Sequence, residues 1–132
     1  MPVRRAIWAA RLATSWASSC GVVTTPQLLA QEVASRAAQM ARRTGMQLLG
    51  VVENMTSEVF GAGGGERLAT ELGVRLLGTV PLDARLRAAG DAGVPLLVSD
   101  PGCDAARAVA ALADTLDASR GAGFTRTLPL VS

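Results

Sequence analysis

The run Gln47-Leu48-Leu49-Gly50-Val51-Val52 decides the fold, because it is largely apolar and has the length of one strand. Strands of this composition are typically buried on both faces, as in a parallel sheet covered by helices. Two further apolar runs of strand length flank it, at 21–24 and 74–80. Helical segments separate the three runs, and this alternation predicts an α/β fold with a parallel sheet.

The segments between the runs carry helix caps and turn residues. The first helix is expected to begin at Thr25-Pro26, where Thr is a good N-cap and Pro suits the first helical position. It is expected to end near Arg43 and to carry an apolar face made by Leu29, Val33, Ala37 and Met40. Further helices are expected over 66–72, 83–89 and 103–116, with loops over 53–65 and 90–95 and a short apolar stretch at 96–98.

Three strands are fewer than a complete doubly wound sheet needs. The sequence therefore predicts a partial, Rossmann-like doubly wound parallel sheet flanked by helices, with its N-terminal half missing or supplied elsewhere. This partial domain is expected over 22–117, preceded by a leader at 1–21 and followed by a flexible tail at 118–132. The tail is rich in Gly, Ser and Thr, as loose chain ends often are.

The leader carries three arginines and no acidic residue. That composition is typical of an organelle transit peptide. On a helix, however, Arg4 and Arg11 would fall beside Ile7 and Trp8, which makes a poor amphipathic helix. A disordered or non-native leader, from mis-started or out-of-frame translation, is the preferred interpretation, and a targeting role is the alternative.

Composition argues against several classes of function. The net charge is only +2 and aromatic residues make up 3% of the chain, so nucleic-acid binding is not expected. The sequence contains no apolar run of about 18 residues, so a membrane span is not expected either. Two cysteines far apart in sequence suit a reducing compartment, and the predicted location is cytoplasmic. Cys20 and Cys103 form no metal-binding spacing, which favours two reduced thiols over a disulfide or a shared metal.

Candidate site residues follow the strands, because ligands of open α/β sheets bind beyond the carboxyl ends of the strands. Three such ends are expected, at 24–27, 53–55 and 81–83. Asn54 is the best candidate for recognising a ligand, since an amide that donates and accepts matches the edge of an adenine. An ordinary turn residue is the alternative. The neighbouring Glu53 is expected to face solvent or to cap the loop.

Two other features have competing interpretations. The glycine-rich stretch 61–65 resembles a phosphate cradle, but it follows a loop and no lysine follows it, so a flexible hinge is preferred. Four aspartates, which also suit metal ions in principle, are expected to act as helix caps and turn residues: Asp83, Asp91, Asp100 and Asp104. No metal ligand and no catalytic residue is therefore predicted.

All thirteen basic residues are arginine, and the sequence contains neither lysine nor histidine. A phosphate loop needs the pattern G-x-x-x-x-G-K-[ST], in which lysine reaches the β- and γ-phosphates. The guanidinium group of arginine is planar and forked, so it does not replace the compact ammonium group of that lysine. The printed chain therefore has no phosphate loop, and without histidine it has no Ser/His/Asp or Cys/His catalytic set.

Five short stretches occur in an order that resembles a known family: 22–27 (VVTTPQ), 50–55 (GVVENM), 60–65 (FGAGGG), 77–83 (LGTVPLD) and 90–95 (GDAGVP). Together they are similar to the C-terminal half of Mrp/ApbC-type iron–sulfur cluster carriers, which belong to the MinD/ParA-like class of phosphate-loop ATPases. The resemblance covers about residues 22–116. It implies a cytosolic, usually homodimeric protein that binds ATP with Mg²⁺, holds a cluster and passes it to apo iron–sulfur proteins.

The resemblance also implies roles for particular residues. The family's adenine-contacting Asn falls on Asn54, and the segment that lies against the base falls on Pro81, Leu82 and Asp83. Many carriers place a C-x-x-C pair where this chain has only residues 56–59, without cysteine. A [4Fe–4S] cluster is therefore not expected on this chain alone, and neither is autonomous ATPase activity.

The predicted function is that of an ATP-binding iron–sulfur cluster carrier, present as a fragment without its phosphate loop. The alternative is a non-catalytic remnant that acts as a dimerisation or interaction module. A third possibility is that a separately encoded N-terminal half completes the sheet.

Overall fold

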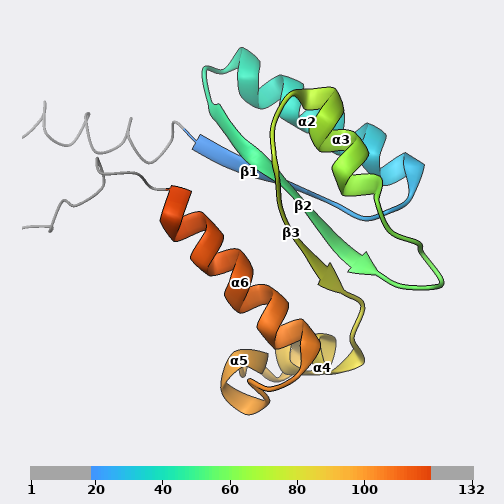
Figure 1. The fold of residues 1–132 in the computed structure, drawn as a ribbon, viewed down its shortest axis with the longest axis vertical. Coiled ribbons are helices and arrows are strands. Elements are labelled where there is room, and N and C mark those ends of the chain that lie inside the picture. The colour runs from blue at the N-terminus through green and yellow to red at the C-terminus, as the bar shows by residue number, and fades with distance from the viewer. Residues whose placement is uncertain (1–18, 120–132) are drawn as a thin grey trace, which may run out of the picture.

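A three-stranded parallel sheet lies at the centre of the molecule (Figure 1). The computed structural model describes residues 19–119. The strands are β1 (Ser19–Thr24), β2 (Gln47–Thr56) and β3 (Leu76–Pro81), and they are ordered β1-β2-β3 with every pair parallel. The predicted α/β class and the partial parallel sheet are confirmed.

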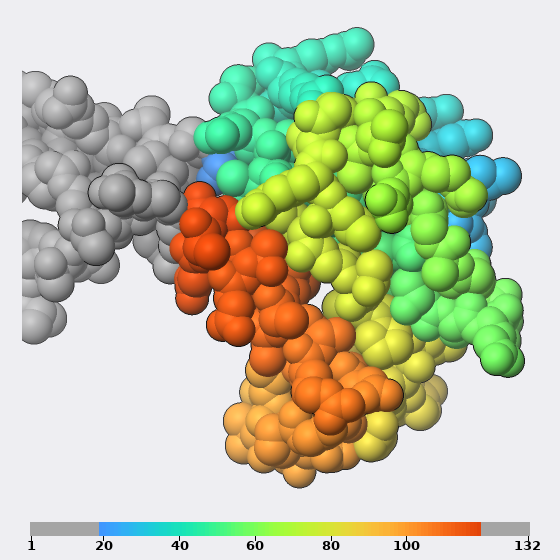
Figure 2. All heavy atoms as spheres, viewed as in Figure 1, coloured from blue at the N-terminus to red at the C-terminus, as the bar shows by residue number. Residues whose placement is uncertain are grey.

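Helices cover the two faces of the sheet unequally (Figure 1). On one face lie α2 (Leu28–Arg43) and α3 (Gly64–Leu72). On the other face α6 (Asp104–Ser119) packs against β3, where Gly78 leaves room for Leu112. The short helices α4 (Ala84–Ala92) and α5 (Leu96–Ser99) connect β3 to α6, and with the first turns of α6 they form a separate lobe below the sheet (Figure 2).

The described residues form two hydrophobic cores. The main core lies between the sheet and the pair α2 and α3, and its buried residues are Val22, Ala34, Ala38, Val51, Leu68, Ala69 and Leu72. A smaller core inside the lobe consists of Leu96, Cys103, Ala105 and Ala106. Both are built from Ala, Leu, Val and Cys, as the scarcity of aromatic residues requires.

The apolar face that the sequence predicts for α2 does not pack on the sheet. Leu29, Val33 and Met40 are 73%, 60% and 68% exposed. The helix instead buries a face of small and polar residues: Gln31, Ala34, Ser35 and Ala38. Small side chains let α2 lie close to β1 and α3, and the two polar ones are satisfied there, because Gln31 donates to the Pro26 carbonyl (2.8 Å) and Ser35 to Glu71 (3.1 Å).

Several predicted boundaries differ from the structure. β2 continues through residues 53–56, which the sequence analysis assigned to a loop, because Glu53, Asn54 and Thr56 still pair with β1 or β3. Residues 19–21, assigned to the leader, form the first half of β1, and the rest of the predicted leader and 120–132 lie outside the described residues. The apolar stretch at 96–98 lies in a helical turn, α5. Across 19–119, no helix is long and apolar enough to cross a membrane.

Candidate functional site

The carboxyl ends of the three strands lie along one edge of the sheet. Asn54 of the central strand pairs with Val80 of β3, and its neighbour Glu53 pairs with Thr24 of β1. Two bonds fasten the ends of β2 and β3: Leu82 N–H donates to the Thr56 carbonyl (2.9 Å), and the Thr56 hydroxyl donates to the Val80 carbonyl (3.4 Å). The three segments at which the sequence predicts a site are therefore neighbours.

A strained bulge holds Asn54 at the end of the central strand. Among the residues described, Met55 is the one non-glycine residue with a positive φ, at +63°, and the pairing with β3 shifts between Asn54 and Thr56. The side-chain amide oxygen of Asn54, Oδ1, accepts a hydrogen bond from Met55 N–H (2.9 Å). This bond uses one of the amide's four hydrogen-bonding positions. Strain of this kind persists where the surroundings over-determine it, and it clusters at ligand sites.

Asn54 also lines a groove of about 720 Å³ between β1 and α2. The polar residues of the groove are at its end near the strand termini, and they are Thr24, Thr25, Gln27 and Asn54. The rest of its wall is largely apolar and includes Val23, Leu29 and Val33. The sequence analysis did not predict this groove, because its wall is the face of α2 that was expected to be buried.

Glu53, beside Asn54, is a buried anchor for the following loop. Its side chain is among the largest that are fully buried, at 1% exposure. One carboxylate oxygen accepts Gly63 N–H at 2.9 Å and the other accepts Gly65 N–H. The expectation that Glu53 faces solvent is wrong, and the alternative that it caps the loop is confirmed. A charge buried at this position is tolerated because it pairs with the unsatisfied amides at the start of α3.

In the glycine-rich stretch, Gly64 and Gly65 pack closely against Pro26 and Glu53, so they form neither a hinge nor a phosphate cradle. The Glu53 carboxylate already takes the amides of Gly63 and Gly65. A Cβ on Gly64 would lie 2.6 Å from the Pro26 carbonyl oxygen, and one on Gly65 would lie 2.6 Å from Glu53 Cβ. The preferred hinge interpretation is therefore wrong for Gly64 and Gly65, which are buried in the first turn of α3.

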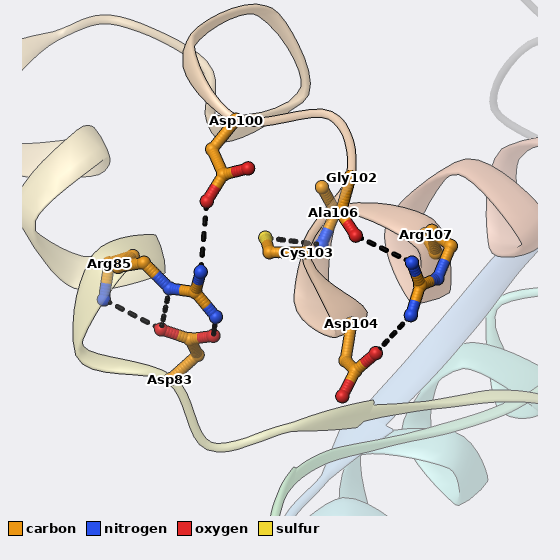
Figure 3. A network of polar contacts seen from close by, with 8 residues as sticks. All are labelled: Asp83, Arg85, Asp100, Gly102, Cys103, Asp104, Ala106 and Arg107. Carbon is orange, nitrogen blue, oxygen red and sulfur yellow. Dashed lines mark hydrogen bonds and ion pairs between the residues drawn. The ribbon is translucent and has the colours of Figure 1, made fainter.

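Asp83, at the end of β3, is engaged by Arg85 (Figure 3). Its carboxylate caps α4 by accepting Arg85 N–H at 2.8 Å, and it accepts the guanidinium at 3.1 and 2.8 Å. These bonds lower the pKa of Asp83 below its ordinary value. The same guanidinium reaches Asp100 at 2.9 Å, so it ties the strand end to the loop before α6. Asp83 therefore acts as the N-cap of α4. Its neighbour Leu82 is 46% exposed.

Thiols and acidic groups of the described chain are dispersed. Cys20 is partly buried in β1, and Cys103 is buried in the lobe, where its sulfur accepts Ala106 N–H at 3.4 Å (Figure 3). Between residues 19 and 119, no cluster of three or more Cys, Asp or Glu side chains suits a metal ion.

After β2 the chain closes a tight turn, in which Ser57 and Gly61 exchange backbone hydrogen bonds of 3.1 and 2.7 Å.

Comparison with known proteins gives the family. The family model described as ParA: NUBPL iron-transfer P-loop NTPase matches residues 11–117. The Iron-sulfur cluster carrier protein of Mycobacterium tuberculosis H37Rv is 47% identical over 114 residues, and the match covers 75% of this chain and 30% of that protein. The protein of the same name from Synechocystis is 43% identical over 103 residues, covering 70% and 29%. The chain thus spans about 30% of the length of these relatives.

Solved structures show the same fold. The septum site-determining protein MinD from Pyrococcus horikoshii, complexed with Mg-ADP, superposes with a TM-score of 0.70 at 24% identity, covering 79% of this chain and 43% of that one. MinD from Aquifex aeolicus gives 0.69 at 18% identity, covering 92% and 50%. The family match extends over most of the chain and agrees with this fold and with the resemblance of the five sequence stretches. The chain therefore belongs to the ParA family of NUBPL-type iron-transfer P-loop NTPases.

Proposed function

We propose that this chain is the adenine-binding part of an ATP-dependent iron–sulfur cluster carrier. The observation that carries the proposal is the Asn54–Met55 bulge, which holds an amide at the end of the central strand of a P-loop NTPase fold. An amide in this position matches the N6 and N7 atoms of adenine, one as a donor and the other as an acceptor. The name of the curated relatives supports the carrier role, and the Mg-ADP bound to a structural relative supports nucleotide binding.

The proposed site extends from Asn54 to the end of β3. Pro81 follows Val80, the strand partner of Asn54, and Leu82 donates a backbone hydrogen bond to Thr56. These links support the proposal that Pro81 and Leu82 offer apolar surface to the base. Asp83 contributes by capping α4 and holding Arg85 rather than by contacting the ligand with a free carboxylate. Mg²⁺ and the phosphates would be bound elsewhere, because the printed chain has no lysine.

The cluster is the proposed cargo, and this chain does not hold it unaided. A [4Fe–4S] cluster usually has four cysteine ligands. This chain has two cysteines, one on a strand of the main sheet and one in the lobe. We propose that the cluster is held only in a homodimeric assembly with the complete fold, in the cytoplasm, and that apo iron–sulfur proteins receive it.

The nucleotide assignment is tested by completing the fold. The chain is joined to the part of the M. tuberculosis relative that it does not match, and ADP and GDP are titrated calorimetrically into the fusion protein. Asn54→Ala leaves the polar edge of the base unpaired, which costs about 1–3 kcal/mol or roughly tenfold to a hundredfold in ADP affinity. Preference for ADP over GDP is also expected to shrink, since guanine reverses the donor and acceptor at its six-position.

The matched control is Glu58→Ala, an exposed residue of the loop that follows β2. Its ADP affinity is expected to equal that of the unmodified fusion. Glu53→Ala would be a poor control, because Glu53 is buried and holds the glycine-rich stretch. An Asn54→Ala fusion with unchanged affinity for both nucleotides would remove Asn54 from the site.

A further inference from the structure

The segment that follows β3 has little hydrophobic packing to hold it in place. Residues 81–83, which the proposed function places against the base, include Leu82 at 46% exposure. The next helix, α4, has no fully buried residue, and its Leu86 and Ala89 are partly buried against the core of the lobe. Polar bonds must therefore fix much of the position of this segment.

Arg85 supplies such bonds from the first turn of α4 (Figure 3). Its guanidinium donates to both carboxylate oxygens of Asp83, at 3.1 and 2.8 Å, and its remaining terminal nitrogen donates to Asp100 at 2.9 Å. The planar fork of arginine suits this arrangement, because it binds one carboxylate with two parallel bonds and keeps a donor for a second. The Asp83 side chain is 14% exposed, so its end of the contact is largely shielded from water.

The second carboxylate belongs to a loop that the core of the lobe holds. Asp100 follows α5, and its N–H donates at 2.8 Å to the carbonyl of Leu96, which is 4% exposed in that core. The Asp100 carbonyl accepts the N–H of Cys103, a second buried residue of the same core, at 3.4 Å. Arg85 therefore links the end of β3 to the buried centre of the lobe.

We propose that Arg85 is a positioning residue of the adenine site, because it ties the segment 81–83 to the lobe. The role rests on the proposed function, which assigns this segment to the base. Both terminal nitrogens of the guanidinium are bonded to carboxylates, so Arg85 acts through the segment rather than by contact with the nucleotide. On its other side the segment is held by the bond from Leu82 N–H to the Thr56 carbonyl. It thus lies between two attachments, one to the central strand and one to the lobe, and a side-chain substitution can remove the second.

The link is tested first in the 132-residue chain without nucleotide, so that failure of the adenine assignment does not affect the result. Arg85→Ala removes both ion pairs but keeps the backbone N–H that Asp83 caps, so α4 should still begin at the same residue. Hydrogen exchange of the Leu82 amide, followed by NMR, is expected to be at least about threefold faster than in the parent. The matched control is Arg107→Ala, which removes an arginine that bonds to Asp104 and Gly102 in the same lobe and should leave this rate unchanged (Figure 3).

The consequence for the site is tested by calorimetry with ADP and GDP in the fusion protein of the nucleotide test. Arg85→Ala is expected to weaken the binding of both nucleotides by the same factor, about three- to tenfold, because the apolar surface of 81–83 is equally available to either purine. Preference for ADP over GDP should remain, unlike in Asn54→Ala. Asp100→Ala should have a similar effect, and the double variant should lose no more than Arg85→Ala alone, since both changes break one link.

Each contrary result has a distinct meaning. Equal exchange of the Leu82 amide in Arg85→Ala and Arg107→Ala would overturn the link itself. Unchanged ADP affinity in Arg85→Ala, in a fusion whose preference for ADP depends on Asn54, would overturn the positioning role and leave the adenine site in place. A fusion that binds no ADP would remove the adenine site, and with it the role of Arg85 there.

Discussion

At the scale of single residues, the site depends on two neighbours of the central strand that point in different directions. Asn54 is turned toward the groove and the strand ends, while Glu53 is buried beneath the start of α3. The carboxylate of Glu53 fixes the glycine-rich stretch, and the bulge at Met55 lies between Asn54 and the last residue of β2, Thr56. The buried carboxylate thus positions the loop that follows β2.

Removal of the Glu53 carboxylate is expected to destabilise the chain strongly. Glu53→Ala leaves the amides of Gly63 and Gly65 without their acceptor, and Gly65 is buried. Unpaired buried donors cost about 1–3 kcal/mol each, so the free energy of unfolding should fall by about 2–4 kcal/mol. Glu53→Gln keeps one acceptor oxygen and should lose less. Urea unfolding measures both, with Glu58→Ala expected within about 0.5 kcal/mol of the parent.

The ion pair of Asp83 predicts a dependence on pH. Arg85 lowers the pKa of Asp83 in the folded chain, so the ionised carboxylate stabilises the fold above its unfolded pKa of about 3.9. This contribution is lost as the pH falls through the lowered folded pKa. Asp83→Asn keeps a good helix cap but loses the charge. Its urea midpoint should therefore lie below that of the parent at pH 7 and converge with it in stronger acid.

Asp91→Asn, an exposed position of α4, is the control for that series. A gap between Asp83→Asn and the parent that stays constant from neutral pH to strong acid would show that the loss is unrelated to ionisation.

At the scale of elements, the positions of the strands could be predicted from the sequence, but the side of each helix that packs on the sheet could not. Each strand is a largely apolar run, which a sequence shows directly, and the central strand is buried on both faces over residues 50–53. The apolar side of α2 was visible too, but periodicity identifies a face without identifying what covers it. In the described chain the small face of α2 meets the sheet, and the face with Leu29 and Val33 is left open. The Met55 bulge was not predictable, because a positive φ at methionine follows from tertiary contacts and not from local propensity.

Two glycine-to-alanine substitutions are expected to have opposite effects on stability, one in the closely packed first turn of α3 and one inside α4. Gly64→Ala would place a Cβ 2.6 Å from the Pro26 carbonyl oxygen, a backbone atom that cannot yield easily. Overpacking of this kind costs about 1–3 kcal/mol. Gly90 lies inside α4 with nothing within 4 Å of its added Cβ, so Gly90→Ala should stabilise by about 0.5–1 kcal/mol. Thermal unfolding distinguishes the two, and a stabilised Gly64→Ala would refute the close-packing assignment.

At the scale of the whole molecule, the described chain is a sheet covered unevenly by helices. One face is closed by α2 and α3, and the other is closed only over β3 by α6. The side of β1 that pairs with no described strand lies beside the exposed residues Leu29 and Val33 of α2, and these residues line the groove that Asn54 also lines.

This arrangement predicts that the chain alone does not hydrolyse ATP and that completing the fold restores the reaction. Phosphoryl transfer depends on positioning and charge around the phosphates, and the printed chain has neither lysine nor a phosphate loop. Phosphate release from Mg²⁺-ATP should equal the blank for the 132-residue chain and rise above it for a fusion with the part of the M. tuberculosis relative that this chain does not match. If that part supplies a phosphate loop, replacing the lysine of its G-x-x-x-x-G-K-[ST] pattern with alanine should return the fusion to the blank. Release by the chain alone that scales with its concentration and survives repurification would place a phosphate site within these residues.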